Sequence, residues 1–532
     1  MRSTLLTCIT ALSLLPAVPA AAHKLEEGNG QLGKVTFANS CDAKVQKELQ
    51  RAVAMLHSFW YSAGEKAFRH VLEDDPSCAV ANWGIASLLM NNPLAGQGAS
   101  PKAAETASAA IEQGRRTGAK TERERDYIEA VAAYYADFGN RPERARQLSR
   151  SQAYDALAAK YPQDDEAQIF DALYTAGTQS QADQSYAANL KAAAMLEKQF
   201  VKYPDHPGVA HYMIHSYDAP PIANQGLTAA RKYSAIAPDA PHALHMPSHI
   251  FTRVGAWQDS VALNRRSADV AKVDASSLVD AYHAADYMVY ALLQLGRDHE
   301  ARKVLDEFKS PGGAVLPQFA GPYAAVSMPA RMAFERGDWD AASQLPVQGT
   351  AFPHTEAITT FARALGAARK GDIDSAEKDA LRLETQQRAL VESKNSYWAT
   401  EVEIQRTATA AWIAKDKGQT DEALRLMRAA ADLEDHNEKH PVTPGRLVPA
   451  RELLGEMLLD LKQPAAALKE FEQSQVREPN RLRGYAGAAT AAVAAGEPDK
   501  ARLHYAKLIE MTREADTPLP EIARAKTYLA AK

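Results

Sequence analysis

The sequence has little of what defines several large classes of protein. β-Branched runs and alternation of apolar with polar residues are scarce along its 532 residues, which argues against an extended β-sheet. Lysine and arginine total 61 against 66 aspartate and glutamate residues, so a formal net charge of −5 provides no basic surface for nucleic acid. Glycine-rich phosphate loops and the GxSxG, HExxH and CxxC motifs are absent. Nucleotide hydrolysis, serine hydrolysis and thiol redox chemistry therefore have no local support.

Long apolar runs are missing too, with one short exception at the N-terminus. Elsewhere no stretch approaches the roughly 18–20 uninterrupted apolar residues that a membrane-spanning helix needs, so we expect no transmembrane segment. The exception follows Arg2 as TLLTCITALSLL (4–15) and ends in the small residues AVPAAA before His23. This order is typical of a secretory signal peptide. We therefore expect residues 1–22 to be removed and the exported chain to be periplasmic or secreted.

Cysteine is nearly absent from the predicted mature chain. Of three cysteines, Cys8 lies inside the predicted signal peptide, which leaves Cys41 and Cys78. In an oxidising compartment an isolated pair is most simply a disulfide bond. Two free buried thiols are the alternative.

Helical periodicity dominates from about residue 42 to the end, and the helices recur in a fixed pattern. A turn with glycine or a polar residue is followed within a few residues by alanine in an amphipathic segment. Examples are GAWQDSVA (255–262), GRDHEARKVL (296–305), GDWDAA (337–342) and GDIDSAEKDA (371–380), with later copies at 418–427, 462–472 and 496–505. The glycines at 255, 296, 337 and 371 are separated by 41, 41 and 34 residues. A period near 34 with helix–turn–helix content is the signature of tetratricopeptide (TPR) repeats.

These repeats predict an all-α protein, a right-handed superhelical solenoid of TPR-like helix–turn–helix units. Each unit buries its apolar side only against its neighbours, so the array folds as one stack. We expect a single solenoid over residues 42–532, after a lead-in at 23–41, without a separate domain. Cys41 and Cys78 then begin two consecutive units, where a bond would join the first repeats.

Histidine is concentrated in the middle of this predicted solenoid. The chain has 15 histidines, and six of them fall within residues 206–249: His206, His211, His215, His242, His245 and His249. His211 and His215 are four residues apart, as are His245 and His249, so each pair shares one face of a helix. The second pair follows the first by 34 residues, which is one repeat. We expect the pairs at equivalent positions on adjacent helices, roughly 8–10 Å apart.

Imidazoles that reach inward from adjacent helices can meet at one shared ion or at two. We expect them to hold a transition metal ion, with copper, zinc and iron as the candidates. The predicted ligands are His211, His215, His245, His249, His283 and Asp286, the last two being placed on the concave face by counting back from the turn at Gly296. Along the same groove we expect His57, His242 and Tyr290. Asp218 and Glu166 are candidates to orient the imidazoles. A histidine-lined groove for a peptide or a small anion is the alternative to a metal site.

A charged loop between two helices, EDHNEKHPVTPG (434–445), is the second candidate site. Pro441 and Pro444 stiffen the loop. Its Glu438, Lys439 and His440 are the candidate acid/base or substrate-anchoring residues. An ordinary rigid connector between helices is the equal alternative.

Several segments resemble those of one group of exported bacterial TPR proteins. They are LHSFWYSAGEKAF (56–68), DPSCAVANWGIA (75–86), HYMIHSYD (211–218), PHALHMPSHIFTRVG (241–255), FARALGAARKGD (361–372) and EKHPVTPGRLVPARELLGEML (438–458). The resemblance covers nearly the whole mature chain and implies the superhelical fold and its groove, but it brings no activity with it.

Two functions from different classes follow from these features. The first is a metal-dependent exported protein, and as an enzyme it would act as a hydrolase or an oxidoreductase on a small organic or peptide substrate in the concave groove. The second is a non-catalytic scaffold that binds a peptide or protein partner along that groove.

Overall fold

The computed structural model describes residues 30–531, except 97, 274–276, 310–315, 317, 348 and 351. The predicted signal peptide at 1–22 and Cys8 lie outside the described residues. Within the described part, no helix is both long and apolar enough to cross a membrane.

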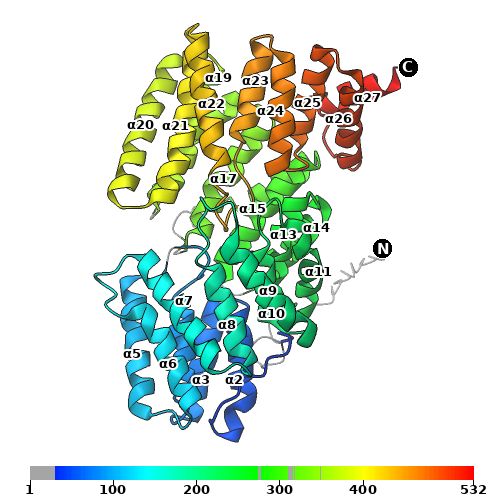
Figure 1. Ribbon diagram of the computed structural model, residues 1–532. Helices are drawn as coiled ribbons and strands as arrows, with labels where there is room; N and C mark the ends of the chain where they lie inside the picture. Colours follow the sequence, from blue (N-terminus) through cyan, green and yellow to red (C-terminus); the bar gives the residue numbers. More distant parts are fainter. Residues whose placement is uncertain are drawn as a thin grey trace, which may run out of the picture.

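The described chain is built of helices joined by short connections (Figure 1). Its first part contains η1 (Ala43–Val45), α2 (Gln46–His57), α3 (Tyr61–Asp74), α4 (Ala81–Leu88), α5 (Pro101–Thr117), α6 (Glu122–Tyr135), α7 (Glu143–Lys160), α8 (Asp165–Ala176), α9 (Ala187–Lys202), α10 (Pro207–Ser216), η2 (Ala223–Gly226), α11 (Leu227–Ile236), α12 (Pro241–His245), α13 (Pro247–Val254) and α14 (Trp257–Ala271). The second part contains α15 (Leu278–Gln294), α16 (Asp298–Glu307), α17 (Ala320–Glu335), α18 (Trp339–Ser343), α19 (Pro353–Arg369), α20 (Ile373–Glu392), α21 (Ser396–Asp416), α22 (Thr420–Asp435), α23 (Ala450–Asp460), α24 (Pro464–Arg477), α25 (Leu482–Ala495), α26 (Pro498–Met511) and α27 (Pro520–Ala530).

The helices stack as the repeat pattern predicts. Each helix packs against the next, and the first helices of successive units also touch, as α19 does α21 and α23 does α25. The predicted all-α, TPR-like solenoid is therefore confirmed. Glycine makes the turns between paired helices: at Gly255 the chain has φ 72°, a left-handed conformation that ends α13.

The solenoid coils tightly enough that repeats far apart in sequence touch one another. Asn480 packs so closely on Gly255 that a Cβ there would collide with it, and the Trp257 indole donates to the Asn480 carbonyl at 2.9 Å. Near the N-terminus, the Lys34 amide donates to the carbonyl of Asp205 at 3.0 Å. In Figure 1 the C-terminal part of the chain, from α19 onward, lies next to α15 and α17.

The connection between α22 and α23, residues 436–449, enters the interior that this coiling encloses; we call it the inner loop. Arg331 of α17 donates to the carbonyls of Gly445 and Arg446, both at 2.9 Å, and the Tyr287 hydroxyl of α15 donates to the Thr443 carbonyl at 3.1 Å. The inner loop therefore fills the concave side of the solenoid beside α15 and α17. Histidines that we expected along an open groove are buried instead.

Cys41 and Cys78 form a disulfide bond, with their Cα atoms 4.8 Å apart. Cys41 precedes η1 and α2, whereas Cys78 precedes α4, so the bond links the starts of the first helices of two consecutive units. The Asp42 amide also donates to the Asp75 carboxylate at 2.7 Å, which reinforces the same junction.

Candidate metal centre

Four helices in the middle of the solenoid carry the histidines: α10, α12, α13 and α15. Proline begins three of them, at Pro207, Pro241 and Pro247, where its fixed φ suits the first helical position and its missing N–H costs nothing. Pro247 also separates α12 from α13. His245 and His249 nevertheless remain neighbours across this break, with ring centroids 5.0 Å apart.

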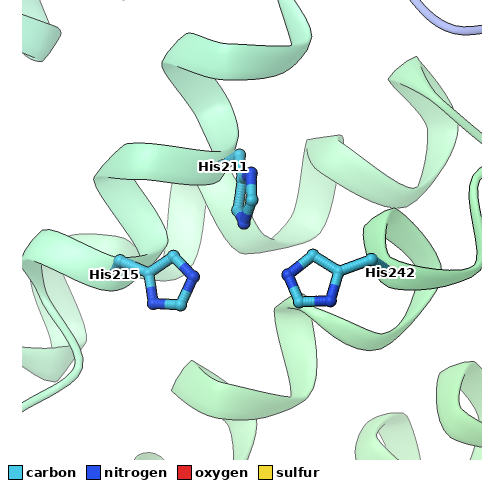
Figure 2. A group of neighbouring side chains, drawn as sticks. All are labelled: His211, His215 and His242. Atoms are coloured by element: carbon cyan, nitrogen blue, oxygen red, sulfur yellow. The ribbon is translucent and has the colours of Figure 1, made fainter. Parts of the chain in front are cut away.

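The first group of histidines consists of His211 and His215 from α10 and His242 from α12. Each contributes one ring nitrogen, and these atoms lie within 4.8 Å of one another. Figure 2 shows the three rings directed toward a common point between the two helices. The His211 ring centroid is 5.0 Å from those of both His215 and His242.

The three nitrogens of this first group lack hydrogen-bond partners. The Nε2 atoms of His211, His215 and His242 are buried, and none has a partner among the described residues. His211 donates its Nδ1–H to the His57 carbonyl at 2.7 Å, which leaves a bare lone pair on Nε2. A buried polar atom without a partner costs about 1–3 kcal/mol, so three at one point are hard to explain by packing alone. A shared ion would satisfy all three.

The second group consists of His245, His249 and His283, from α12, α13 and α15. Its ligand atoms also lie within 4.8 Å of one another. His245 donates Nδ1–H to Asn264 Oδ1 at 2.6 Å, and His249 donates Nδ1–H to Asp218 Oδ2 at 3.0 Å. Both Nε2 atoms are therefore unprotonated in the neutral rings, yet they face each other at 3.0 Å. Two opposed lone pairs repel unless a proton or a metal ion lies between them.

The partners of this second group are themselves fixed in orientation. The Asn264 side-chain amide donates to the Ser260 carbonyl at 2.7 Å, which turns its oxygen toward His245. Asp218 is held by Lys439 Nζ at 3.1 Å and by Arg253 Nε at 2.8 Å. Carboxylates and amides that accept the second ring N–H are the usual support for a metal-bound histidine.

Burial keeps these six imidazoles neutral. Removal from water lowers the pKa of His211, His215, His242, His245 and His283 well below 6.5, and neighbouring imidazoles lower it further. The pKa of His249 is also lowered by burial, although Asp218 opposes the shift. Neutral imidazole is the form that binds a metal ion. The groups are therefore in the ligating form at pH 7.

A third cluster, His57, Glu166 and His206, has the residue types of a metal site but is closed by hydrogen bonds. Glu166 accepts from Nε2 of His57 at 2.9 Å and from Nε2 of His206 at 3.0 Å, while Nδ1 of His57 meets the Tyr212 hydroxyl at 2.9 Å. Burial acts to raise the pKa of Glu166, but the two histidines outweigh it and keep the carboxylate ionised. This cluster supports the first group through the His57 carbonyl.

The structure distributes the predicted ligands differently from the sequence-based set. Each HxxxH pair belongs to its own group and takes its third histidine from the first helix of the following repeat, α12 for the first group and α15 for the second. Asp286 lies elsewhere and pairs with Arg331 Nε at 2.9 Å, and Tyr290 accepts from Arg481 Nη1 at 2.9 Å. His242, predicted only to line the groove, completes the first group. The equal 34-residue spacing of His215, His249 and His283 in the sequence indicates that these three histidines occupy equivalent positions in three successive repeats.

The inner loop places its three candidate residues in three different environments. Lys439 contacts the second group through Asp218, and burial lowers its pKa to about 8. Glu438 accepts from the Tyr186 hydroxyl at 2.7 Å and pairs with Arg477. His440 packs against Trp398 and Phe319, with ring centroids 5.3 Å away in each case.

A pocket of about 680 Å³ adjoins both histidine groups. Its wall includes His242 from the first group and His283 from the second. The aromatic part of the wall contains Phe319, Phe352, His354, Tyr397, Trp398 and His440.

The sequence matches no known family model and no curated protein. Among solved structures it is similar to Cut9 in the APC/C Cut9–Hcn1 hetero-tetramer (13% identity, 91% of this chain and 95% of that chain, TM-score 0.28). It is also similar to yeast Tom70 (12% identity, 91% and 88%, TM-score 0.29) and to a chain of Naa15/Naa10 bound to HypK-THB (14% identity, 90% and 70%, TM-score 0.22).

Proposed function

We propose that this chain is a metal-binding protein that holds transition metal ions in two three-histidine sites. The observation that carries the proposal is the convergence of three buried Nε2 atoms, those of His211, His215 and His242, that have no partner among the described residues. The second group supports it, because its facing Nε2 lone pairs also call for a cation. Imidazole nitrogen suits copper, zinc and iron, at about 2.0–2.1 Å for zinc.

The solenoid itself does not need these ions to fold. Its helix pairs bury apolar side chains along the whole described chain, on both sides of the histidine groups. A purely structural ion is normally enclosed by four ligands, whereas three ligands per site leave a position for another ligand. This supports a functional ion rather than a structural one.

Export to the periplasm or the medium is part of the same proposal. The bond between Cys41 and Cys78 supports it, because such bonds persist in oxidising compartments.

A non-catalytic scaffold that binds a peptide or protein partner is the second candidate. The TPR-like fold supports this function, since many solenoids bind partners on their concave surfaces. A scaffold, however, has no need of two buried groups of convergent imidazoles.

Metal analysis of variants separates the two functions. Untagged protein is stripped with a chelator, loaded with copper or zinc, desalted and analysed for metal per chain. We expect two ions in the wild type and one in His211→Ala or His249→Ala, because each variant removes a ligand from one group only. The control is His299→Ala, an exposed histidine outside both groups, which should retain two. A wild type without bound metal, or a control that loses as much as the variants, favours the scaffold.

A further inference from the structure

The two histidine groups are neighbours, which bears on what their ions can do together. Helix α12 supplies His242 to the first group and His245 to the second, with ring centroids 6.0 Å apart. A second link joins α10 to α13, where His215 and His249 have centroids 5.6 Å apart. Ions in both groups would therefore lie side by side in one two-metal centre.

The charges around the centre favour metal ions of low charge. All six candidate ligands are neutral imidazoles. Asp218, the carboxylate that touches the second group, is already paired with the cations Lys439 and Arg253. Placing charge in a buried site is costly unless it is compensated. Among divalent first-row ions copper binds nitrogen ligands most strongly, and after reduction two copper(I) ions bring half the charge of two divalent ions.

The pocket borders both groups at once. His242 and His283, one from each group, line the same 680 Å³ space. With three protein ligands on each ion, an open position remains for a small molecule.

The aromatic wall of that pocket indicates the class of substrate. Trp398 stacks on His354, with centroids 4.6 Å apart and planes 17° apart, and on His440 at 5.3 Å and 29°. Flat rings of this kind offer stacking and edge contacts to another aromatic ring. The wall thus fits a small, flat aromatic ring.

We propose that the two groups form a two-copper centre that uses dioxygen to oxidise a small aromatic diol bound in the pocket; this rests on the proposed metal-binding function. Two copper(II) ions each take one electron from an ortho-diol, which loses its two hydroxyl protons and becomes an ortho-quinone. Dioxygen then takes one electron from each copper(I) ion and two protons, and leaves as hydrogen peroxide. One diol and one dioxygen yield one quinone and one peroxide.

The test uses the full mature chain loaded with two copper ions and catechol as the probe. An oxygen electrode and quinone absorbance should record equal amounts of dioxygen consumed and quinone formed, faster than with the same copper bound to free imidazole. Protein loaded with zinc, which has no redox chemistry, should be inactive. In His242→Ala the rate should fall to that of free copper.

A pocket variant checks the substrate assignment separately. Trp398→Ala should retain two copper ions and raise KM for catechol about tenfold, because it removes a stacking surface. Helical circular dichroism confirms that the variant is folded. If protein with two bound copper ions is no faster than free copper, the oxidation is wrong while metal binding stands. If no copper binds, both proposals are wrong, and an unchanged KM in Trp398→Ala overturns the substrate site.

Discussion

Hydrogen bonds to one nitrogen of an imidazole decide what the other nitrogen can do. In His211, His245 and His249 the Nδ1–H is donated to a carbonyl, an amide oxygen and a carboxylate, respectively. Each donation fixes the tautomer and leaves a lone pair on Nε2. Metal binding is therefore supported by the hydrogen bonds of the Nδ1 atoms as well as by the proximity of the histidines.

The amide that orients His245 provides the first prediction. Asn264→Ala removes the acceptor for Nδ1–H, so the second site should lose about 10- to 100-fold in metal affinity. The first site should be unchanged, because Asn264 touches only the second group among the histidines described. Competition with a chelator of known affinity resolves the two sites. Asn140→Ala, an exposed asparagine, is the matched control, and equal weakening of both sites would contradict the assignment.

The buried histidines of the pocket provide the second prediction. Burial lowers the pKa of both His354 and His440 to about 3, from the ordinary 6.5. Between these values the unfolded chain binds a proton at each position and the folded chain does not, so stability falls as pH falls from 6.5 toward 3. Each residue contributes at most about 1.4 kcal/mol per pH unit.

Urea unfolding of metal-free protein between pH 7 and pH 4.5 measures this slope. Replacing His354 with Phe should make the slope shallower, because one proton-binding site disappears from the unfolded state. His436→Phe, at an exposed histidine of the inner loop, should leave the slope unchanged. A His354→Phe slope equal to that of the wild type would show that His354 is not held neutral by the fold.

Part of the site could be predicted from residue spacing alone. His211 and His215 share one helix as expected, because a four-residue spacing places two side chains on the same face. His245 and His249 lie on α12 and α13, on either side of a break, yet their rings remain neighbours. The sequence did not place His242 with His211 and His215, and it did not predict the pairing of Asp286 with Arg331, for one reason. Which side chain meets which depends on the tilt between neighbouring helices, and Arg331 of α17 attracts the Asp286 carboxylate. The spacing of residues in the sequence does not reveal that Arg331 pairs with Asp286.

At the scale of elements, turns and helix pairs follow directly from the sequence. The glycines that set the repeat occupy left-handed turns at Gly255, Gly296, Gly337 and Gly371. The inner loop was less predictable. Its two prolines indicated a rigid connector, whereas its path into the interior depends on Arg331, Tyr287 and Asp218 from distant helices.

The disulfide provides the third prediction, at the level of the first repeats. Because the Cys41–Cys78 bond closes a 37-residue separation, Cys78→Ser should lower the free energy of unfolding by about 2–4 kcal/mol. The loss should be local, since contacts in a solenoid are mostly between neighbours. Hydrogen exchange should accelerate in α2–α4 and not in α21–α24. Thiol titration of denatured, unreduced wild type should find no free thiol, and two titratable thiols would contradict the bond.

At the scale of the whole molecule, the sequence indicates a stack but not how tightly it coils. Contacts such as Trp257 with Asn480 and the Leu482 amide with Gln294 join repeats that are about 190–220 residues apart, and they result from small rotations summed over many units. This coiling converts a predicted open groove into a closed interior with a pocket. Burial in turn lowers the pKa of the histidines and deprives their nitrogens of water.

Anomalous diffraction from crystals of copper-loaded protein shows directly whether the two histidine groups bind metal. Data collected on either side of the copper absorption edge locate the metal without assumptions about ligands. We expect two peaks about 2 Å from imidazole nitrogens. One should be bound by Nε2 of His211, His215 and His242, and the other by His245, His249 and His283. Loaded crystals without a peak at either group, or with peaks only at exposed histidines such as His299, would contradict this expectation.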